Sequence, residues 1–510
     1  MTRSGVCRAH GGNPGIEFGA ISFAMKILHS LASAAFLSIF SATLAHAQNF
    51  VSSQSADVVI GKANFTTSTP TTASATNTNV TSDAVVDPTT GKLFVCDEAN
   101  NRVLRFSSTA AAASGAAAEA VFGQPDLTTA TANTGGLSAS SLSDPVGIYV
   151  DSGGALWVAD AGNNRVLRFD TATGVVSPPV LTADQVIGQA NFTTATSGTT
   201  LTTLSNPRDV WVDGSGNLYV ADATNNRVLR FDAVAGLGNG PSASRVFGQA
   251  NGTSNAAATT PTGLSNPVSV CVDGSGALWV ADQTNNRVLR FNAAASAATD
   301  GPAASGVLGQ ATFLSAVGAT TQSGLSGPRG VNVTASGRLW VSDFANNRVL
   351  WFDGAATKAN GGLADGVLGQ DNFTSSVAGL NQQKVAGPAG VFQDVAGHLW
   401  LADSNNHRVL RFTAPTPQPP VITLFGPTKR TTTAASLHIK GSTSDADGIV
   451  VVVKGTTNGH RETAKGTTNW RYHAKKLKKG VNFVRIYALD DDGLQSNVLH
   501  IKIIRKVPRF

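Results

Sequence analysis

Histidine and cysteine are scarce in this 510-residue chain, which contains nine His and three Cys. Zinc sites and disulfide frameworks need several such residues at characteristic spacings, and the sequence shows no such set. Cys7 lies near the N-terminus, and we expect Cys96 and Cys271, which are far apart in sequence, to be single buried thiols. Between residues 48 and 413 the only histidines are His398 and His407, which we expect to be exposed.

Charged residues are also few, at 14% of the chain, whereas 42% of the residues are hydrophobic. This composition allows a large buried core and excludes a disordered chain. Long apolar runs are missing except near the N-terminus, where a short basic stretch at Met25 is followed by an apolar run and by Ala45-His-Ala47. We expect residues 1–47 to be an upstream extension and a signal peptide, with Met25 as the start and cleavage after Ala47. The mature protein would then begin at Gln48, would be secreted, extracellular or periplasmic, and would have no transmembrane segment.

A ten-residue phrase, in most copies Asp-x-x-Asn-Asn-Arg-Val-Leu-Arg-Phe, recurs six times at intervals of 60 to 63 residues. Each repeat unit also holds four short segments rich in Val, Leu, Trp and Phe, separated by Gly, Asn and Asp, which is typical of strands and turns. The periodicity therefore predicts an all-β fold, a six-bladed β-propeller with four antiparallel strands in each blade. The copies are Asp97–Phe106, Asp160–Phe169, Asp222–Phe231, Asp282–Phe291, Asp343–Phe352 and Asp403–Phe412.

The order of the segments also indicates how the ring closes. Residues 58–62 read Val-Val-Ile-Gly-Lys and are similar to Val-Phe-Gly-Gln at 121–124, the outer strand of the first complete unit. The sixth unit ends at Phe412 without such a strand. We expect the N-terminal segment to complete the sixth blade, which would join the ends of the ring and remove an exposed sheet edge.

The phrase, preceded by a strand that begins with Pro and by a Gly turn, resembles the NHL repeat family over the span Asp57–Phe412. The resemblance implies a propeller but says little about function, because propellers of this type include enzymes. An amidating lyase that resembles this fold uses channel histidines around a metal, and related lactonase and streptogramin-lyase propellers need carboxylates or a histidine base in the channel. The two propeller histidines both belong to the sixth repeat, which cannot supply ligands from around a channel.

Pro-rich residues 414–420 predict a stiff linker between the propeller at 48–413 and a second domain at 421–510. The second domain alternates apolar and polar residues, as in Ser436-Leu-His-Ile-Lys440, which predicts a small β-sandwich. Its pattern of Gly, Asn-Trp and Asp-Asp-Asp-Gly resembles the Ig-like or fibronectin-like modules of secreted bacterial proteins. It carries 16 Lys and Arg against 6 Asp and Glu, whereas the propeller has a net negative charge.

Two features of the second domain could bind ligands. The acidic turns at 445–448 and 490–493 could hold Ca²⁺ or another divalent metal, but Asp-Gly also makes ordinary turns, and we favour that interpretation, with no cofactor. A short run of lysines beside Trp470 and Tyr472 could bind an anionic polymer or could be a solvated hairpin face. No signature of a dedicated nucleic-acid site occurs. The lysines of the run are Lys475, Lys476, Lys478 and Lys479.

Residues that are identical in every blade cannot mark one unique site, so we interpret the Asp and the first Arg of the phrase as scaffold. The Asp ends one strand and the Arg begins the next, across a turn where charge-assisted hydrogen bonds can satisfy the loop backbone. At the second Arg of the phrase the fifth blade has Trp351, which indicates that this side chain contributes mainly packing. The scaffold pairs are Asp97 and Arg102, Asp160 and Arg165, Asp222 and Arg227, Asp282 and Arg287, Asp343 and Arg348, and Asp403 and Arg408.

Function is then expected where the blades differ, and the residues that begin the innermost strands are unlike one another. They predict a binding cluster at the mouth of the channel, formed by Asp83, Arg208, Asp209, Ser269 and Arg329. The charged members could equally be solvated rim residues, which is the more common outcome. A metal held by Asp83 and Asp209 is a further hypothesis.

Together these patterns favour a non-catalytic binding scaffold, a monomer with a protein or carbohydrate ligand on the loop face of the propeller. The second domain would be a spacer or a surface anchor. The alternative is a metal-dependent enzyme of the lyase or lactonase type with its site in the central channel. No catalytic residue is predicted, since a propeller fold alone does not imply an activity.

Overall fold

The computed structural model describes residues 50–70, 72–170, 172–174, 181–415, 421–444, 449–454, 461–466, 468–489 and 495–507. The predicted signal peptide, most of the predicted linker and both candidate Ca²⁺ turns lie outside these residues. The chain divides into two compact units, Gln48–Thr416 and a second one that includes Pro417–Phe510. In the described ranges no helix combines the length and the apolar character needed to cross a membrane.

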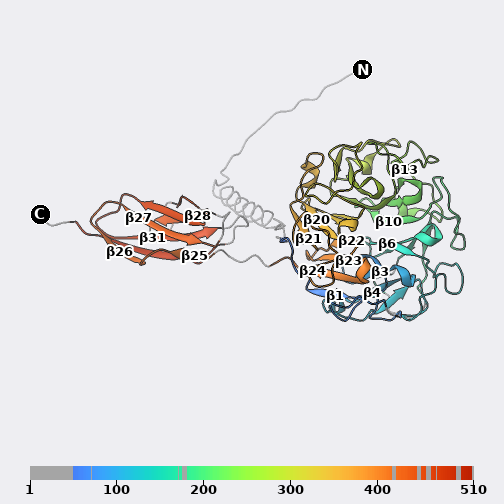
Figure 1. Ribbon diagram of the computed structural model, residues 1–510, viewed down its shortest axis with the longest axis horizontal. Coiled ribbons are helices and arrows are strands. Elements are labelled where there is room, and N and C mark those ends of the chain that lie inside the picture. The colour runs from blue at the N-terminus through green and yellow to red at the C-terminus, as the bar shows by residue number, and fades with distance from the viewer. Residues whose placement is uncertain are drawn as a thin grey trace, which may run out of the picture. The chain divides into compact units, whose positions relative to one another are not determined.

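The first unit contains six four-stranded antiparallel sheets arranged as the blades of a propeller (Figure 1). From the innermost strand outward, the first blade is β2 (Thr81–Val86), β3 (Leu93–Asp97), β4 (Arg102–Phe106) and β5 (Ala120–Phe122), and the second is β6 (Pro145–Val150), β7 (Leu156–Asp160), β8 (Arg165–Phe169) and β9 (Gln185–Ile187). The third is β10 (Pro207–Val212), β11 (Leu218–Asp222), β12 (Arg227–Phe231) and β13 (Arg245–Phe247), and the fourth is β14 (Pro267–Val272), β15 (Leu278–Asp282), β16 (Arg287–Phe291) and β17 (Gly306–Leu308). The fifth is β18 (Pro328–Val333), β19 (Leu339–Asp343), β20 (Arg348–Phe352) and β21 (Gly366–Leu368), and the sixth is β22 (Pro388–Gln393), β23 (Leu399–Asp403), β24 (Arg408–Phe412) and β1 (Val58–Ile60).

Helical structure in this unit is limited to short turns. Each repeated phrase folds into one 3₁₀ turn between the second and third strands of its blade: η1 (Glu98–Asn100), η2 (Ala161–Asn163), η3 (Ala223–Asn225), η5 (Gln283–Asn285), η7 (Phe344–Asn346) and η9 (Ser404–Asn406). The remaining turns are α2 (Ser108–Ala111), η4 (Val234–Gly236), η6 (Ala294–Ser296) and η8 (Ala355–Thr357).

The N-terminal strand closes the ring. β1 pairs antiparallel with β24, with Val59 opposite Leu410, so the blue start of the propeller lies beside its orange end in Figure 1. Val59 packs against the fifth blade, whereas Val58 and Ile60 pack against the first. Such alternation is expected of a strand buried on both faces. The predicted six-bladed all-β fold with this closure is confirmed.

Apolar layers between neighbouring blades form the core of the propeller. Cys96 lies in the layer between the first and second blades and Cys271 in the layer between the fourth and fifth. Both thiols are free and buried, as expected.

The second Asn of each phrase links its blade to the next one. Asn164 has a left-handed backbone, with a φ of 52°, and its Oδ1 accepts the N–H of Asn206 in the third blade at 2.9 Å. His407 takes this position in the sixth blade, where its Nδ1 accepts the N–H of Val80 at 2.9 Å. The expectation that His407 and His398 are exposed was therefore wrong, because both are half-buried and hydrogen-bonded, His398 to a neighbouring carboxylate.

The second Arg of the phrase does more than pack. In three blades it donates a hydrogen bond to a loop carbonyl of the following blade, and an acidic side chain holds the guanidinium in the first and third blades. The prediction that it contributes mainly packing is therefore wrong for these blades, although Trp351 in the fifth blade is buried between aromatic and aliphatic neighbours. The three pairs are Arg105 with Ala172, Arg230 with Ala294 and Arg290 with Ala356.

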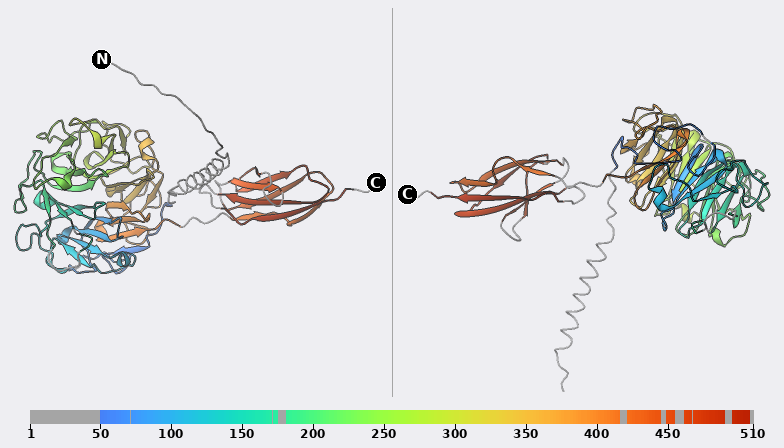
Figure 2. Two further views of the ribbon diagram at one scale, coloured as in Figure 1. Left: turned by 180° about the vertical axis from the view of Figure 1, so that it is seen from behind. Right: turned by 90° about the horizontal axis from the view of Figure 1, so that it is seen from below.

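The second unit has two sheets that enclose one apolar core (Figure 2). Three strands form the first sheet, in the order β25 (Ile422–Leu424), β27 (Leu437–Thr443) and β30 (Asn469–Ala474). Five form the second, in the order β26 (Lys429–Thr432), β32 (Leu499–Arg505), β31 (Gly480–Leu489), β28 (Ile449–Lys454) and β29 (Arg461–Thr463). Ile439 and Trp470 of the first sheet pack with Val452 and Ile486 of the second, which gives the predicted β-sandwich.

Candidate functional site

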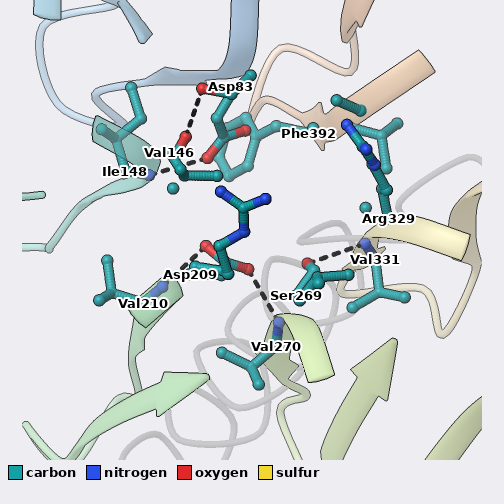
Figure 3. A pocket seen from close by; sticks show the side chains of 18 of the residues that line it. Asp83, Val146, Ile148, Asp209, Val210, Ser269, Val270, Arg329, Val331 and Phe392 are labelled. Atoms are coloured by element: carbon teal, nitrogen blue, oxygen red, sulfur yellow. Dashed lines mark hydrogen bonds between the residues drawn. The ribbon is translucent and has the colours of Figure 1, made fainter. Parts of the chain in front are cut away.

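The five candidate residues line one pocket in the central channel, formed by the innermost strands of all six blades (Figure 3). The pocket has a volume of about 60 Å³, enough for a few waters or one compact chemical group. The structure thus brings together all the residues that the comparison of blades selected: Asp83 on β2, Arg208 and Asp209 on β10, Ser269 on β14 and Arg329 on β18.

An irregular start of each innermost strand explains why these side chains face the pocket. In β10 the regular pairing with β11 shifts between Pro207 and Asp209, and equivalent shifts occur in the other innermost strands. Proline lacks the N–H for a regular ladder, and a bulge redirects the side chains beside it. The second and third residues of all six innermost strands line the pocket, together with some of the residues that follow them.

Three of the five candidate side chains join neighbouring blades. Each accepts a backbone N–H from the innermost strand of the next blade, so these bonds hold the ring together around the channel. The pairs are Asp83 with Ile148 at 3.0 Å, Asp209 with Val270 at 2.9 Å and Ser269 with Val331 at 3.1 Å.

The pKa values of the two candidate carboxylates, Asp83 and Asp209, are raised. Burial raises the pKa of Asp83 to about 7, although backbone N–H groups oppose this change. Burial, together with the charge of Asp83, raises the pKa of Asp209 to about 8. The pair therefore changes its charge near neutral pH.

Asp83 and Asp209 do not form a complete Ca²⁺ site by themselves. In the part of the chain that the structure describes, no group of three or more His, Cys, Asp or Glu residues is placed to hold a metal ion. Ca²⁺ takes about six to eight oxygen ligands, whereas Asp83 and Asp209 offer two carboxylates whose oxygens already accept backbone N–H groups.

Among the described residues, the two arginines interact through charge with Glu98 but bond to no side chain or backbone group. Arg208 comes from the third blade and Arg329 from the fifth, and neither makes a hydrogen bond or an ion pair there. The guanidinium of Arg329 lies over the ring of Phe344, 3.5 Å from its centroid, and its Nε is buried without an acceptor. Burial and the charge of Arg208 lower the pKa of Arg329. Two half-buried cations that repel each other are costly, and Glu98, which attracts both, offsets only one of the two charges while it is ionised.

Sequence analysis missed three further residues at this pocket. Glu98 and Gln283 line it, and Phe344 lies under Arg329. All three directly follow the repeated Asp, at a position where the other blades have Ala161, Ala223 and Ser404. Comparison of the blades at that position would have found them. Burial and the nearby Asp144 raise the pKa of Glu98 to about 7, while Arg208 and Arg329 act in the opposite direction.

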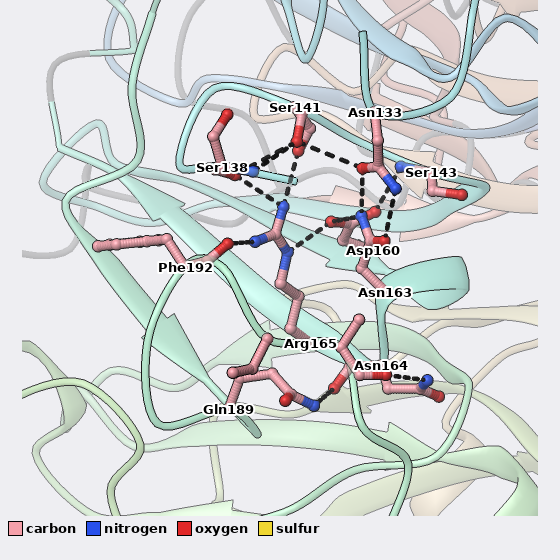
Figure 4. Close-up of polar contacts among 12 residues, drawn as sticks. Asn133, Ser138, Ser141, Ser143, Asp160, Asn163, Asn164, Arg165, Gln189 and Phe192 are labelled. Atoms are coloured by element: carbon pink, nitrogen blue, oxygen red, sulfur yellow. Dashed lines mark hydrogen bonds and ion pairs between the residues drawn. The ribbon is translucent and has the colours of Figure 1, made fainter. Parts of the chain in front are cut away.

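The repeated Asp and Arg residues lie away from the pocket, fully buried within each blade (Figure 4). In the second blade Arg165 Nε donates to Asp160 Oδ2 at 2.7 Å, and both side chains are 0% exposed. The remaining N–H groups of Arg165 donate to the carbonyl oxygens of Ser138 at 3.0 Å, Ser141 at 2.8 Å and Phe192 at 2.6 Å. The other five pairs have the same ion pair at 2.7–2.8 Å. These pairs hold loops in place and do not face a ligand.

Comparisons with known proteins agree with this architecture. The model of the NHL repeat matches residues 142–169, 204–231, 264–291, 325–352 and 386–412. The first blade, where Thr81 stands in place of the usual Pro, is not among the matches. A comparison with curated proteins finds no match.

Solved structures similar to this chain include two lyases and a proposed gluconolactonase. A streptogramin B lyase is 13% identical, with 64% of this chain and 77% of that one covered and a TM-score of 0.37. A virginiamycin B lyase from Staphylococcus aureus is 15% identical over 65% and 79%, with a TM-score of 0.35. A proposed gluconolactonase is 15% identical over 66% and 89%, with a TM-score of 0.39. These similarities carry no argument about activity, whereas the matched repeats and the six blades show that the chain is an NHL-repeat β-propeller protein.

Proposed function

We propose that this protein is a non-catalytic binding scaffold whose propeller holds a protein or carbohydrate ligand at the mouth of the channel. An anionic group of that ligand would lie between Arg208 and Arg329. The observation that carries this proposal is the pair of half-buried guanidiniums, which make no hydrogen bond or ion pair with the described residues and share a single carboxylate, Glu98, as counter-charge. Guanidinium binds carboxylate, sulfate and phosphate through parallel hydrogen bonds. Because the pocket holds only a compact group, the rest of the ligand would lie over the surrounding loops.

We further propose that the protein acts as a monomer at or outside the cell envelope, with its C-terminal unit as spacer or anchor. The predicted signal peptide at residues 25–47 and the opposite net charges of the two parts support this placement. The run Lys475, Lys476, Lys478 and Lys479 is exposed and is one place where an anionic polymer could attach.

A binding screen tests the propeller site. The mature chain would be applied to acidic peptides and uronic-acid oligosaccharides, each beside a neutral counterpart of the same length. We expect acidic ligands to bind, and Arg208→Gln and Arg329→Gln each to weaken binding by roughly tenfold or more, the value of a charge-assisted hydrogen bond. Val268→Ala is the matched control, because Val268 has the same strand position in the fourth blade and no charge. Equal binding of neutral ligands, or unchanged binding in both Arg variants, would contradict the proposal.

A metal-dependent lyase or lactonase is the second candidate. The raised pKa values of Asp83 and Asp209 favour it, since perturbed carboxylates gather at active sites. Elemental analysis of the dialysed mature chain, with Asp209→Asn as the matched variant, separates the two candidates. A stoichiometric metal that the variant loses would favour the enzyme.

A further inference from the structure

The outer face of the three-stranded sheet in the C-terminal unit carries a line of cations. Side chains of β27 and β30 alternate between the core and this face, so every second residue points outward. Over about six residues at roughly 3.3 Å each, the line extends about 20 Å. Its members, called here the cationic track, are Lys440, Lys465, Arg471 and Lys475, with His438 and His473 among them.

Like charges meet directly in this track. Lys440 lies opposite Arg471 in the pairing of β27 with β30, and Lys465 pairs with Arg471 on its other side through two backbone hydrogen bonds of 2.9 Å. Like charges in such positions destabilise a sheet. Among the residues that the structure describes, none of these three cations has an ion-pair partner. An arrangement of this kind is expected where an anionic partner compensates for the repulsion.

A pocket lies within the track. It has a volume of about 320 Å³, in the range of small-molecule sites, with Lys440, Lys465 and Arg471 around it and Phe425 and Trp470 in its walls. Trp470 lines the pocket, but its side chain is 1% exposed and packs in the core, so the exposed ring of Phe425 is the aromatic surface open to a ligand.

We propose that the cationic track binds an anionic polysaccharide, a chain with carboxylate or sulfate groups, and that one sugar unit occupies the pocket beside Phe425. A polymer fits better than a single ion, because the cations are spread along the strands. The exposed ring of Phe425 suits the apolar face of a sugar ring, and Ser442 and Asn469 on the outer face of the sheet offer hydrogen bonds to hydroxyl groups. This surface belongs to the C-terminal unit, so the proposal does not depend on the ligand of the propeller.

Binding measurements on the full mature chain test this proposal. The polymers are polygalacturonate, dextran sulfate and neutral dextran, each at low and at moderate salt. We expect one or both anionic polymers to bind and neutral dextran not to bind. Lys440→Ser with Arg471→Ser should weaken binding by roughly tenfold or more and make it less sensitive to salt. Lys502→Ser with Lys506→Ser is the matched control, because it removes the same charge from exposed residues on and just after β32 of the other sheet, outside the track, and should change binding little.

The two anionic polymers distinguish carboxylate from sulfate as the recognised group. Failure of the wild-type chain to bind either polymer would overturn the proposal, as would equal losses in the two double variants. Tighter binding of single-stranded DNA than of both polysaccharides would also overturn it and would assign the track to nucleic acid. All four substituted residues are exposed, and thermal unfolding of each variant would confirm that the fold is unchanged.

Discussion

Arg165→Met should destabilise the propeller much more than the loss of a surface charge would. The guanidinium donates to the Asp160 carboxylate and to three loop carbonyl oxygens at 2.6–3.0 Å, and its side chain is 0% exposed. Removal of one partner of a buried ion pair costs about 3–5 kcal/mol, because the other charge is left uncompensated. Three orphaned carbonyl oxygens add to this cost. We therefore expect a loss of about 4 kcal/mol or more in the free energy of unfolding.

A double-mutant cycle identifies the buried charge as the cause. Asp160→Asn combined with Arg165→Met leaves no charge in the site, so the double variant should lose less stability than the sum of the two single variants. Arg165→Lys keeps the charge but has a single ammonium in place of the planar fork, and should lie between wild type and Arg165→Met. Urea unfolding followed by tryptophan fluorescence measures the wild type and all four variants. A loss below about 1 kcal/mol for Arg165→Met, or additive single losses, would refute the reasoning.

Three further changes test individual contacts. His407→Asn should make the propeller less sensitive to acid, because the His407 Nδ1 accepts a backbone N–H only while it is unprotonated. Burial lowers the pKa of His407, so the wild type should lose stability as pH falls below the unfolded value of about 6.5, and thermal unfolding near pH 5 and near pH 7 measures this. Gly188→Ala should lower the melting temperature by an amount equivalent to about 1–3 kcal/mol, since φ is 83° and a Cβ would collide with a neighbouring leucine, whereas Gly214→Ala, with nothing within 4 Å, should not. Asp209→Asn should reduce the fall in stability that we expect as pH rises from about 4 through about 8, because the pKa of Asp209 is raised in the folded state, and melting curves across this range would show it.

The repeated phrase allowed the blades to be predicted well because its chemistry is local. In each blade the second strand ends at the Asp and the third begins at the Arg, as at Asp160 and Arg165. The turn between them needs a residue that tolerates a left-handed backbone, and the second Asn, such as Asn164 with a φ of 52°, is suited to it. These requirements involve residues within one turn of each other, so they can be seen in the sequence.

The roles of the site residues could not be predicted in the same way. Comparison of the blades selected Asp83, Asp209 and Ser269 together with Arg208 and Arg329, but the first three join neighbouring blades, whereas the two arginines make no hydrogen bond or ion pair with the described residues. Whether a side chain meets a backbone N–H depends on the bulge in the adjacent blade, about 60 residues away. The raised pKa values likewise arise from burial in a channel that exists only when the ring is closed.

Departure from the repeat does not by itself indicate a binding site, as the seam between the last and first blades shows. In the second blade the Gln189 side chain donates to the backbone carbonyl of Asn164 at 2.9 Å, and four other blades have the equivalent bond. The sixth blade has Lys62 at this position, which is 1% exposed and donates to the carbonyl oxygen of Thr78 at 2.7 Å. The Thr78 hydroxyl in turn donates to the carbonyl oxygen of His407 at 2.8 Å. Lys62, Thr78 and His407 thus replace the hydrogen bond that Gln makes in the other five blades.

The same comparison separates these residues from the arginines of the channel. Lys62 and His407 differ from the other blades because the chain ends meet there, and each satisfies a backbone group that the ordinary repeat would satisfy otherwise. Arg208 and Arg329 also differ from the other blades, yet neither satisfies a backbone group among the described residues, and each brings a charge into a narrow pocket. A substitution that repairs the scaffold lowers the free energy of the isolated protein, whereas an unpaired, half-buried cation raises it. Glu98 offsets the cost that the isolated protein bears at Arg208 and Arg329 only in part, because it is one carboxylate beside two cations. A bound anion would offset the rest, and for that reason the channel mouth, and not the seam, is the place to look for the ligand.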